Sequence, residues 1–223
     1  MKSFLNKFFH KHDFMVESPE YAKEQLLAFL KEDYKKNGHP IEAFNIVGVR
    51  NSENIDKDVI NDFLIYWAED DVFVTRGTTE SGVAYFLNKH IRNKKGTFTL
   101  NYGFHEKIWC IGIHKGYEAF VNDWEHCKPT KGWRDVNYNF VKDPTDIEVC
   151  DYFGINCHRA HPFKLLDKIG RYSAGCQVVR SNKDFQKFLV AFKSTSIYKN
   201  NKYATVNYKL YSYKEFPLQL ISV

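Results

Sequence analysis

The sequence of 223 residues lacks any stretch of about 20 consecutive apolar residues, the length that a helix needs to cross a bilayer. Residues 1–16 also lack the apolar core and the small-residue cleavage site of a secretory signal peptide. We therefore expect a protein that is made in the cytoplasm and has no membrane span. If it acts in a cell envelope, it must leave the producing cell by lysis or inside a virion.

Cysteine is scarce, and its pattern argues against a disulfide scaffold. The five cysteines are an odd number and include no C-x-x-C pair, which favours reduced thiols. The chain contains enough potential ligands for a zinc site, namely His126, Cys127, Cys150, Cys157 and His161. Their spacing is irregular, so we expect no metal and no cofactor.

The sequence also lacks the blocks of basic and aromatic residues that mark nucleic-acid-binding motifs. We therefore expect no specific nucleic-acid partner. The net charge of +5 favours polyanionic partners in general, which include anionic cell-wall polymers. Aromatic residues make up 17% of the chain, and such residues favour strands.

Apolar alternation and turn residues predict mostly strands. The expected strands are 43–50, 62–67, 72–75, 97–102, 107–114, 117–121, 154–157, 177–180 and one or two within 203–213. We expect a helix from Ser18 to Asn37 and another after Ser181, which has the pattern of a helix cap. The resulting fold class is mainly β, a β-rich α+β domain over residues 41–223, preceded by an N-terminal helical arm over residues 1–40.

Two further segments leave alternatives open. The apolar stripe of Phe4, Leu5, Phe8 and Phe9 fits a helix that packs on its own domain, docks on another protein such as a virion protein, or lies on a membrane surface. Residues 124–149 are expected to be irregular. They include Asp135-x-Asn137-x-Asn139, which has the oxygen ligands of half a calcium loop but not its glycine, so we expect a plain turn there.

The candidate catalytic residues lie in the region from Gly154 to Phe192. His158 ends one short strand, and Cys176 precedes another. Two neighbouring strand ends would bring an imidazole base to a thiol nucleophile. The residues just before the thiol, Ser173-Ala174-Gly175, are small and flexible, so their backbone N–H groups could turn toward an oxyanion.

This block, His158 followed by I-G-R-Y-S-A-G-C, resembles the signature of the L,D-transpeptidase (YkuD-type) family. The resemblance implies a curled antiparallel sheet or sandwich. It also implies that Cys176 attacks a peptidoglycan stem peptide, that His158 is the base and that amides around Gly175 form the oxyanion hole, with Ser173 at the Ser/Thr position of the family. The sequence departs from the family at Ala174, usually His, at Val178, usually Arg, and at Arg159, usually Gly.

The block also resembles a group of phage-encoded proteins, and that resemblance extends upstream to Gly48–Arg50, Thr78–Gly82 and Ile111–Ala119. It brings in Arg50 and His114 as candidate substrate-binding residues. A histidine at a strand end is more often a surface turn residue, and the alternative is that His114 faces the same cleft as His158. Arg159 is a third candidate, because a guanidinium beside the base could bind a substrate carboxylate, although it could equally be a surface ion-pair partner.

We therefore expect a phage-encoded, cysteine-dependent peptidoglycan peptidase or transpeptidase that works through a thioester. The alternative is a non-catalytic virion structural or adaptor protein that keeps the fold. A third hypothesis is a cysteine hydrolase that acts on an amide outside the cell wall. If Cys176 has a lowered pKa, a thiol-reactive probe should label it selectively at neutral pH.

Overall fold

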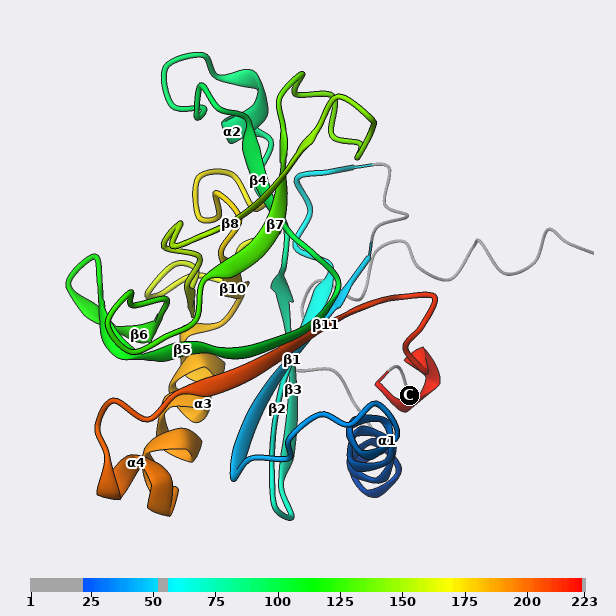
Figure 1. Ribbon diagram of the computed structural model, residues 1–223, viewed down its shortest axis with the longest axis vertical. Helices are drawn as coiled ribbons and strands as arrows, with labels where there is room; N and C mark the ends of the chain where they lie inside the picture. Colours follow the sequence, from blue (N-terminus) through cyan, green and yellow to red (C-terminus); the bar gives the residue numbers. More distant parts are fainter. Residues whose placement is uncertain (1–21, 52–55, 222–223) are drawn as a thin grey trace, which may run out of the picture.

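The structure is a computed structural model that describes residues 22–51 and 56–221 (Figure 1). The strands are β1 (Phe44–Arg50), β2 (Asp62–Ala68), β3 (Val72–Thr78), β4 (Thr97–Leu100), β5 (Gly103–His114), β6 (Tyr117–Val121), β7 (Thr130–Asp135), β8 (Ile147–Asp151), β9 (Cys157–Arg159), β10 (Gln177–Val179) and β11 (Val206–Ser212). The helices are α1 (Lys23–Lys36), α2 (Ala84–Leu87), α3 (Asn182–Ser194), α4 (Ser196–Asn200) and the 3₁₀ helix η2 (Leu218–Leu220).

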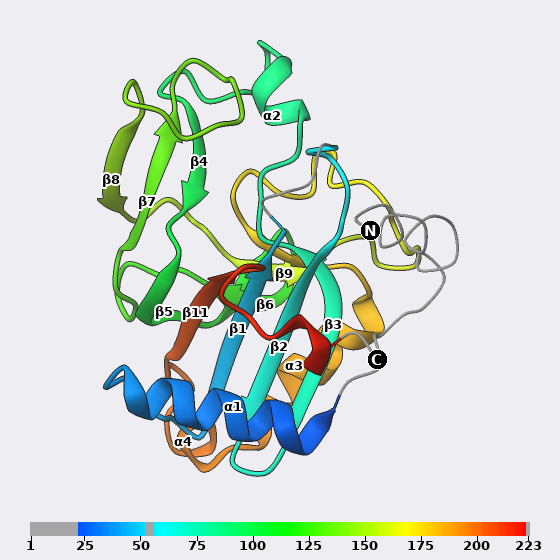
Figure 2. The same cartoon turned by 90° about the vertical axis from the view of Figure 1, so that its right-hand side faces the viewer.

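Eight strands form a closed barrel in the order β1-β11-β5-β6-β9-β10-β3-β2 (Figures 1 and 2). Most neighbours are antiparallel, but β1 pairs with β11 and β9 pairs with β10 in parallel. The prediction of a mainly β protein is confirmed. Where a curled antiparallel sheet or sandwich was expected, the structure has a closed barrel, because the parallel pairing of β1 with β11 closes the sheet on itself and leaves no edge.

Strands β1 and β2 are buried on both faces, which explains their nearly continuous apolar sequences. The face that carries Ile46 and Leu64 points into the barrel core, where it belongs to the same apolar cluster as the buried side of α3. The opposite face, with Val47 and Ile65, packs under α1. Helix α1 thus belongs to the same packed body as the barrel, and Figure 2 shows it lying across β1, β2 and β3.

Helix α3 begins as its sequence predicts. The Ser181 side chain accepts a hydrogen bond from the Asp184 N–H. The predicted apolar face, consisting of Phe185, Phe188, Leu189 and Phe192, is buried in the barrel core.

A separate sheet of three strands, in the order β4-β7-β8, stands beside the barrel (Figure 1). The prediction that residues 124–149 are irregular is therefore wrong, since β7 and the start of β8 lie within them. The turn that follows β7 is closed by its own bonds. The buried Asp135 carboxylate accepts the backbone N–H groups of Asn139 and Phe140, at 3.2 and 2.7 Å.

Part of the predicted N-terminal arm lies outside the described residues, including its apolar stripe and the expected helix start at Ser18. The described part of that helix begins at Lys23. Within residues 22–51 and 56–221, no helix combines the length and apolar character that a bilayer span requires.

Candidate active site

The pairing of β9 with β10 brings the predicted base and nucleophile to one face of the barrel wall. Gln177 lies opposite Cys157, and Val178 lies opposite His158. Side chains alternate between the two faces of a strand. Cys157 and Val179 point into the barrel core, so His158 points outward, and Cys176, one residue before Gln177, points outward as well.

The Cys176 thiol is partly exposed and contacts two backbone groups. The Asn156 N–H donates to Sγ at 3.5 Å, and Sγ donates to the Gly154 carbonyl oxygen at 3.6 Å. Burial raises the pKa of this thiol, and hydrogen bonds from the Asn156 and Ala174 N–H groups act against that rise. The lowered pKa that selective labelling at neutral pH would require is therefore absent.

Ser173 and Gly175 shape the turn that presents the thiol. The buried Ser173 hydroxyl donates to the Cys176 carbonyl oxygen at 2.7 Å and accepts the Gly175 N–H at 3.1 Å. Gly175 has a φ of +112°, and a Cβ there would approach Phe98 at 3.0 Å. Glycine is needed at this position for both reasons. The Gly175 N–H is already engaged by Ser173, so in this conformation it is unavailable to an oxyanion.

The same turn is anchored to the barrel interior. The Gln177 amide donates to the Gly175 carbonyl oxygen at 3.1 Å and accepts the Tyr208 hydroxyl at 2.6 Å. On the other side, the Gly82 N–H donates to the Ser173 carbonyl oxygen at 3.0 Å. The position of the thiol is therefore set from two strands, β10 and β11, and from the loop that follows β3.

The His158 ring is held in one tautomer. Its Nδ1 lies 2.8 Å from the Arg159 carbonyl oxygen, and a carbonyl oxygen can only accept, so Nδ1 carries the proton. The Tyr117 hydroxyl also donates to this carbonyl, at 3.4 Å. The lone pair then resides on Nε2, where a base needs it. Burial lowers the pKa of His158 to about 3, so the ring is neutral at physiological pH.

His114 lies against His158, with ring centroids 4.3 Å apart and planes at 19°. Its Nδ1 is 3.0 Å from the Asn156 amide nitrogen. The Asn156 oxygen accepts the Asn122 N–H, which fixes the amide so that its nitrogen donates to His114. The structure thus brings His114 to the outward face that carries His158.

The Arg159 guanidinium lies over the Tyr117 ring, 4.0 Å from its centroid, and donates to the Ala160 carbonyl oxygen at 3.2 Å. No carboxylate in the described part of the chain lies within ion-pair distance of it. Most of its donors therefore remain available to an incoming group.

Arg50 has a different environment from the other predicted residues. It is buried and donates to the Thr79 hydroxyl, the Thr79 carbonyl and the Leu100 carbonyl at 2.7–3.0 Å. It lines a cavity of about 490 Å³ together with Glu80 and Trp133. None of these contacts joins Arg50 to Cys176 or His158, and its bonds tie the end of β1 to neighbouring segments.

The sequence alone did not identify three residues that hold the side chains of the site in place, namely Asn156, Tyr117 and Gln177. Asn156 had a usable signal, because it precedes His158 by two residues and must share its face of the strand. Tyr117 and Gln177 had none, since their contacts join segments that are far apart in the chain.

Comparison with known proteins adds no assignment. No family model matches the chain, and no curated protein matches its sequence.

Proposed function

We propose that this protein is a cysteine-dependent acyl-transfer enzyme of the L,D-transpeptidase type that cleaves or exchanges stem-peptide bonds of bacterial peptidoglycan, in the setting of phage lysis or entry. The observation that carries the proposal is the shared outward face of Cys176 and His158, with the His158 tautomer that leaves Nε2 unprotonated. The choice of substrate rests on the motif resemblance.

The Cys176 thiol and the His158 ring both start neutral, so the first step includes transfer of the thiol proton to the ring. As Sγ of Cys176 attacks the carbonyl carbon, Nε2 of His158 takes the thiol proton. The tetrahedral intermediate collapses when the carbon–nitrogen bond breaks, and His158 gives the proton to the leaving amine. Water or an acceptor amine then attacks the thioester, His158 removes its proton, and Cys176 leaves as the thiol.

The oxyanion needs donors other than the Gly175 N–H. The Cys176 N–H is a suitable one, because it has no hydrogen-bond acceptor among residues 22–51 and 56–221. The Ala174 N–H, which already interacts with the sulfur, is a second. Two such N–H groups beside the sulfur form the usual arrangement that stabilises a tetrahedral oxyanion.

Substrate binding falls to Arg159 and His114. Stem peptides carry free carboxylates, and the Arg159 guanidinium, stacked on Tyr117, can bind one with two parallel hydrogen bonds. Nε2 of His114 is buried without a partner in the described part of the chain, and a substrate carbonyl oxygen could accept its proton. Arg50 would act indirectly, by holding the loop at Thr79.

Purified sacculi provide the test. Wild-type protein should release soluble muropeptides, whereas Cys176→Ala and His158→Gln should release none above background. Cys150→Ala is the matched control, because Cys150 is an exposed cysteine on β8. Release by Cys176→Ala at the wild-type rate would refute the proposal. Activity of the wild type on simple peptide amides but not on sacculi would favour a cysteine hydrolase with another substrate.

A second candidate function is a non-catalytic virion structural or adaptor protein. Two observations favour it: the pKa of the Cys176 thiol is raised, and Ser173 occupies the Gly175 N–H. It predicts that wild type and Cys176→Ala are equally inert on sacculi, and that both are recovered with purified phage particles. The docking segment for virion proteins would then be the N-terminal arm.

A further inference from the structure

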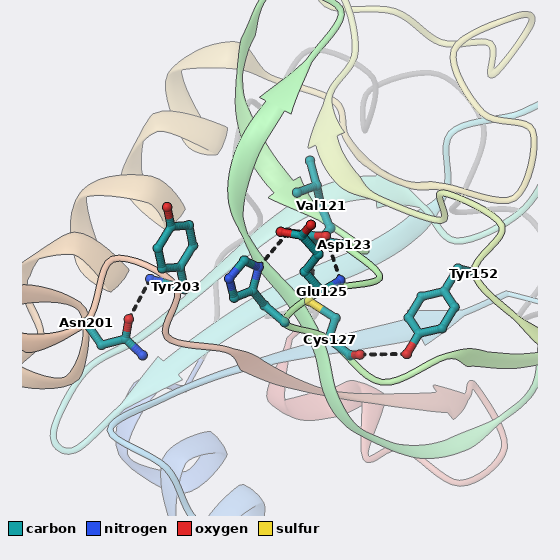
Figure 3. A network of polar contacts seen from close by, with 8 residues as sticks. Val121, Asp123, Glu125, Cys127, Tyr152, Asn201 and Tyr203 are labelled. Carbon is teal, nitrogen blue, oxygen red and sulfur yellow. Dashed lines mark hydrogen bonds and ion pairs between the residues drawn. The ribbon is translucent and has the colours of Figure 1, made fainter.

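A second cluster of reactive side chains lies away from the proposed active site, where the chain turns back after β6. Ligand atoms of Cys110, Asp123 and His126 lie within 4.8 Å of one another. The Cys127 thiol lies beside the Cys110 thiol, and the two interact. Figure 3 shows Asp123 and Cys127 on this turn.

The turn is rigidly joined to β5, the strand that carries Cys110. The buried Asn122 side chain donates to the carbonyl oxygens of Ile108 and Lys128, at 2.8 and 3.0 Å. The Cys127 N–H donates to the Asp123 carbonyl oxygen at 2.9 Å. Both sulfurs are therefore held close together before any ligand arrives.

The other two groups are also held in place. Nδ1 of His126 is 2.7 Å from an Asp123 carboxylate oxygen, and the ring stacks on Tyr203 at 4.2 Å. The side chains of Asp123 and His126 are each 27% exposed, whereas Cys110 and Cys127 are buried. The cluster thus has buried sulfurs, and an ion could enter from its polar side.

This set of donors favours one kind of ion. Thiolates are soft ligands that magnesium and calcium do not select, and imidazole and thiolate together suit zinc. Structural zinc is bound by four protein ligands in a tetrahedron, with bonds of about 2.0–2.3 Å. Such bonds place ligand atoms within about 4 Å of one another, so the ligand atoms of Cys110, Asp123 and His126, which already lie within 4.8 Å, need little movement. The Cys127 thiol lies outside this group of three and donates to the Val121 carbonyl oxygen at 3.6 Å, so it must turn from that carbonyl to become the fourth ligand.

We propose that Cys110, Asp123, His126 and Cys127 bind one zinc ion, which clips the turn after β6 to strand β5. On binding, the two thiols lose their protons and become thiolates, and the ion is neither oxidised nor reduced. The site is independent of the proposed function, since it shares no residue with Cys176 and His158. It also differs from the zinc site considered from sequence, because Cys150 is exposed on β8 and Cys157 points into the barrel core.

The test is metal titration of the full-length protein under reducing conditions. The wild type should bind one equivalent of zinc in competition with a chromophoric chelator. Cobalt in its place should show a thiolate charge-transfer band and the visible spectrum of a tetrahedral ion. Mutation of a partner outside the ligand set typically lowers metal affinity by about 10- to 100-fold, so Cys110→Ser, Asp123→Asn and His126→Gln, which each change a proposed ligand, should lower it by more than about 100-fold. Cys150→Ser should bind zinc as the wild type does.

Circular dichroism of each variant separates loss of the site from loss of the fold. If Cys110→Ser unfolds, Asp123→Asn and His126→Gln, whose side chains lie toward the surface, provide the decisive comparison. Absence of stoichiometric zinc binding by the folded, reduced wild type would overturn the proposal. So would equal affinity in all variants, or a Cys110–Cys127 disulfide that forms in air in a protein that binds no zinc when reduced.

Discussion

Protonation of His158 should make the fold sensitive to acid. The ring is 3% exposed and stacks on His114, with the positive charges of Lys115 and Arg159 nearby. Burial is the largest cause of its low pKa. The hydrogen bond to the Arg159 carbonyl acts against it, and the neighbouring charges of His114, Lys115 and Arg159 lower the pKa further. In the unfolded chain the same ring titrates at its ordinary pKa of about 6.5.

The direction and size of the effect follow from these two values. Below pH 6.5 the unfolded chain binds a proton that native His158 does not bind until the pH approaches 3. The free energy of unfolding therefore falls as the pH drops from about 6.5 toward 3, and is unaffected by this residue above that window. At pH 4.5 the loss should be about 2–3 kcal/mol, from about 1.4 kcal/mol for each pH unit below 6.5.

Urea unfolding of the wild type and His158→Gln at pH 7.5 and pH 4.5 measures this effect. The wild type should lose about 2–3 kcal/mol more than His158→Gln, which has no proton to bind at this position. His90→Gln is the control for removing a histidine, since His90 is exposed and its hydrogen bond to Asn88 is made by its backbone. Equal losses in the wild type and His158→Gln would refute the assignment of a buried, neutral ring.

Three further predictions concern the turn around the thiol. Because burial raises the pKa of Cys176, iodoacetamide should alkylate this thiol slowly at pH 7 and faster as the pH rises. The exposed Cys150 should be modified first, and peptide mapping by mass spectrometry checks this order. Rapid labelling of Cys176 at pH 7 would contradict the prediction. Tyr208→Phe removes the buried hydrogen bond to the Gln177 side chain and should lower the free energy of unfolding by about 1–2 kcal/mol in urea; an unchanged midpoint would count against it. Gly175→Ala should lower the free energy of unfolding by about 1–3 kcal/mol, because residue 175 has a positive φ and a Cβ there would crowd Phe98. Ala174→Gly, at an exposed position, should lower it by less than about 1 kcal/mol, as thermal denaturation can measure. Equal losses in the two variants would argue against a strained turn.

Local patterns were sufficient to predict much of the fold. The hairpin of β5 and β6 turns at Lys115-Gly116, as its sequence indicates, with φ values of +49° and +85°. Strand β7 was missed because its sequence, T-K-G-W-R-D, shows little apolar alternation. It packs through Gly132, where the missing side chain leaves room for the Phe98 ring, and such a contact has no signature in the strand itself.

Barrel closure and the details of the site depend on pairings between distant segments. The parallel pairing of β1 with β11 joins residues about 160 positions apart, and no local periodicity specifies it. At the site, the motif predicted Cys176 and His158 as partners. It did not predict that the Ser173 hydroxyl would take up the Gly175 N–H, because the conformation of one side chain in a turn decides that bond.

Trapping the acyl-enzyme tests the central claim most directly. Wild-type protein is incubated with a stem peptide, quenched in acid to preserve thioesters and digested with trypsin, which cleaves after Arg171 and Arg180. We predict an acyl adduct on the peptide 172–180, carried by Cys176, absent from Cys176→Ala and strongly reduced in His158→Gln. An adduct on another cysteine, or the same adduct yield in His158→Gln as in the wild type, would contradict the pairing of this thiol with this base.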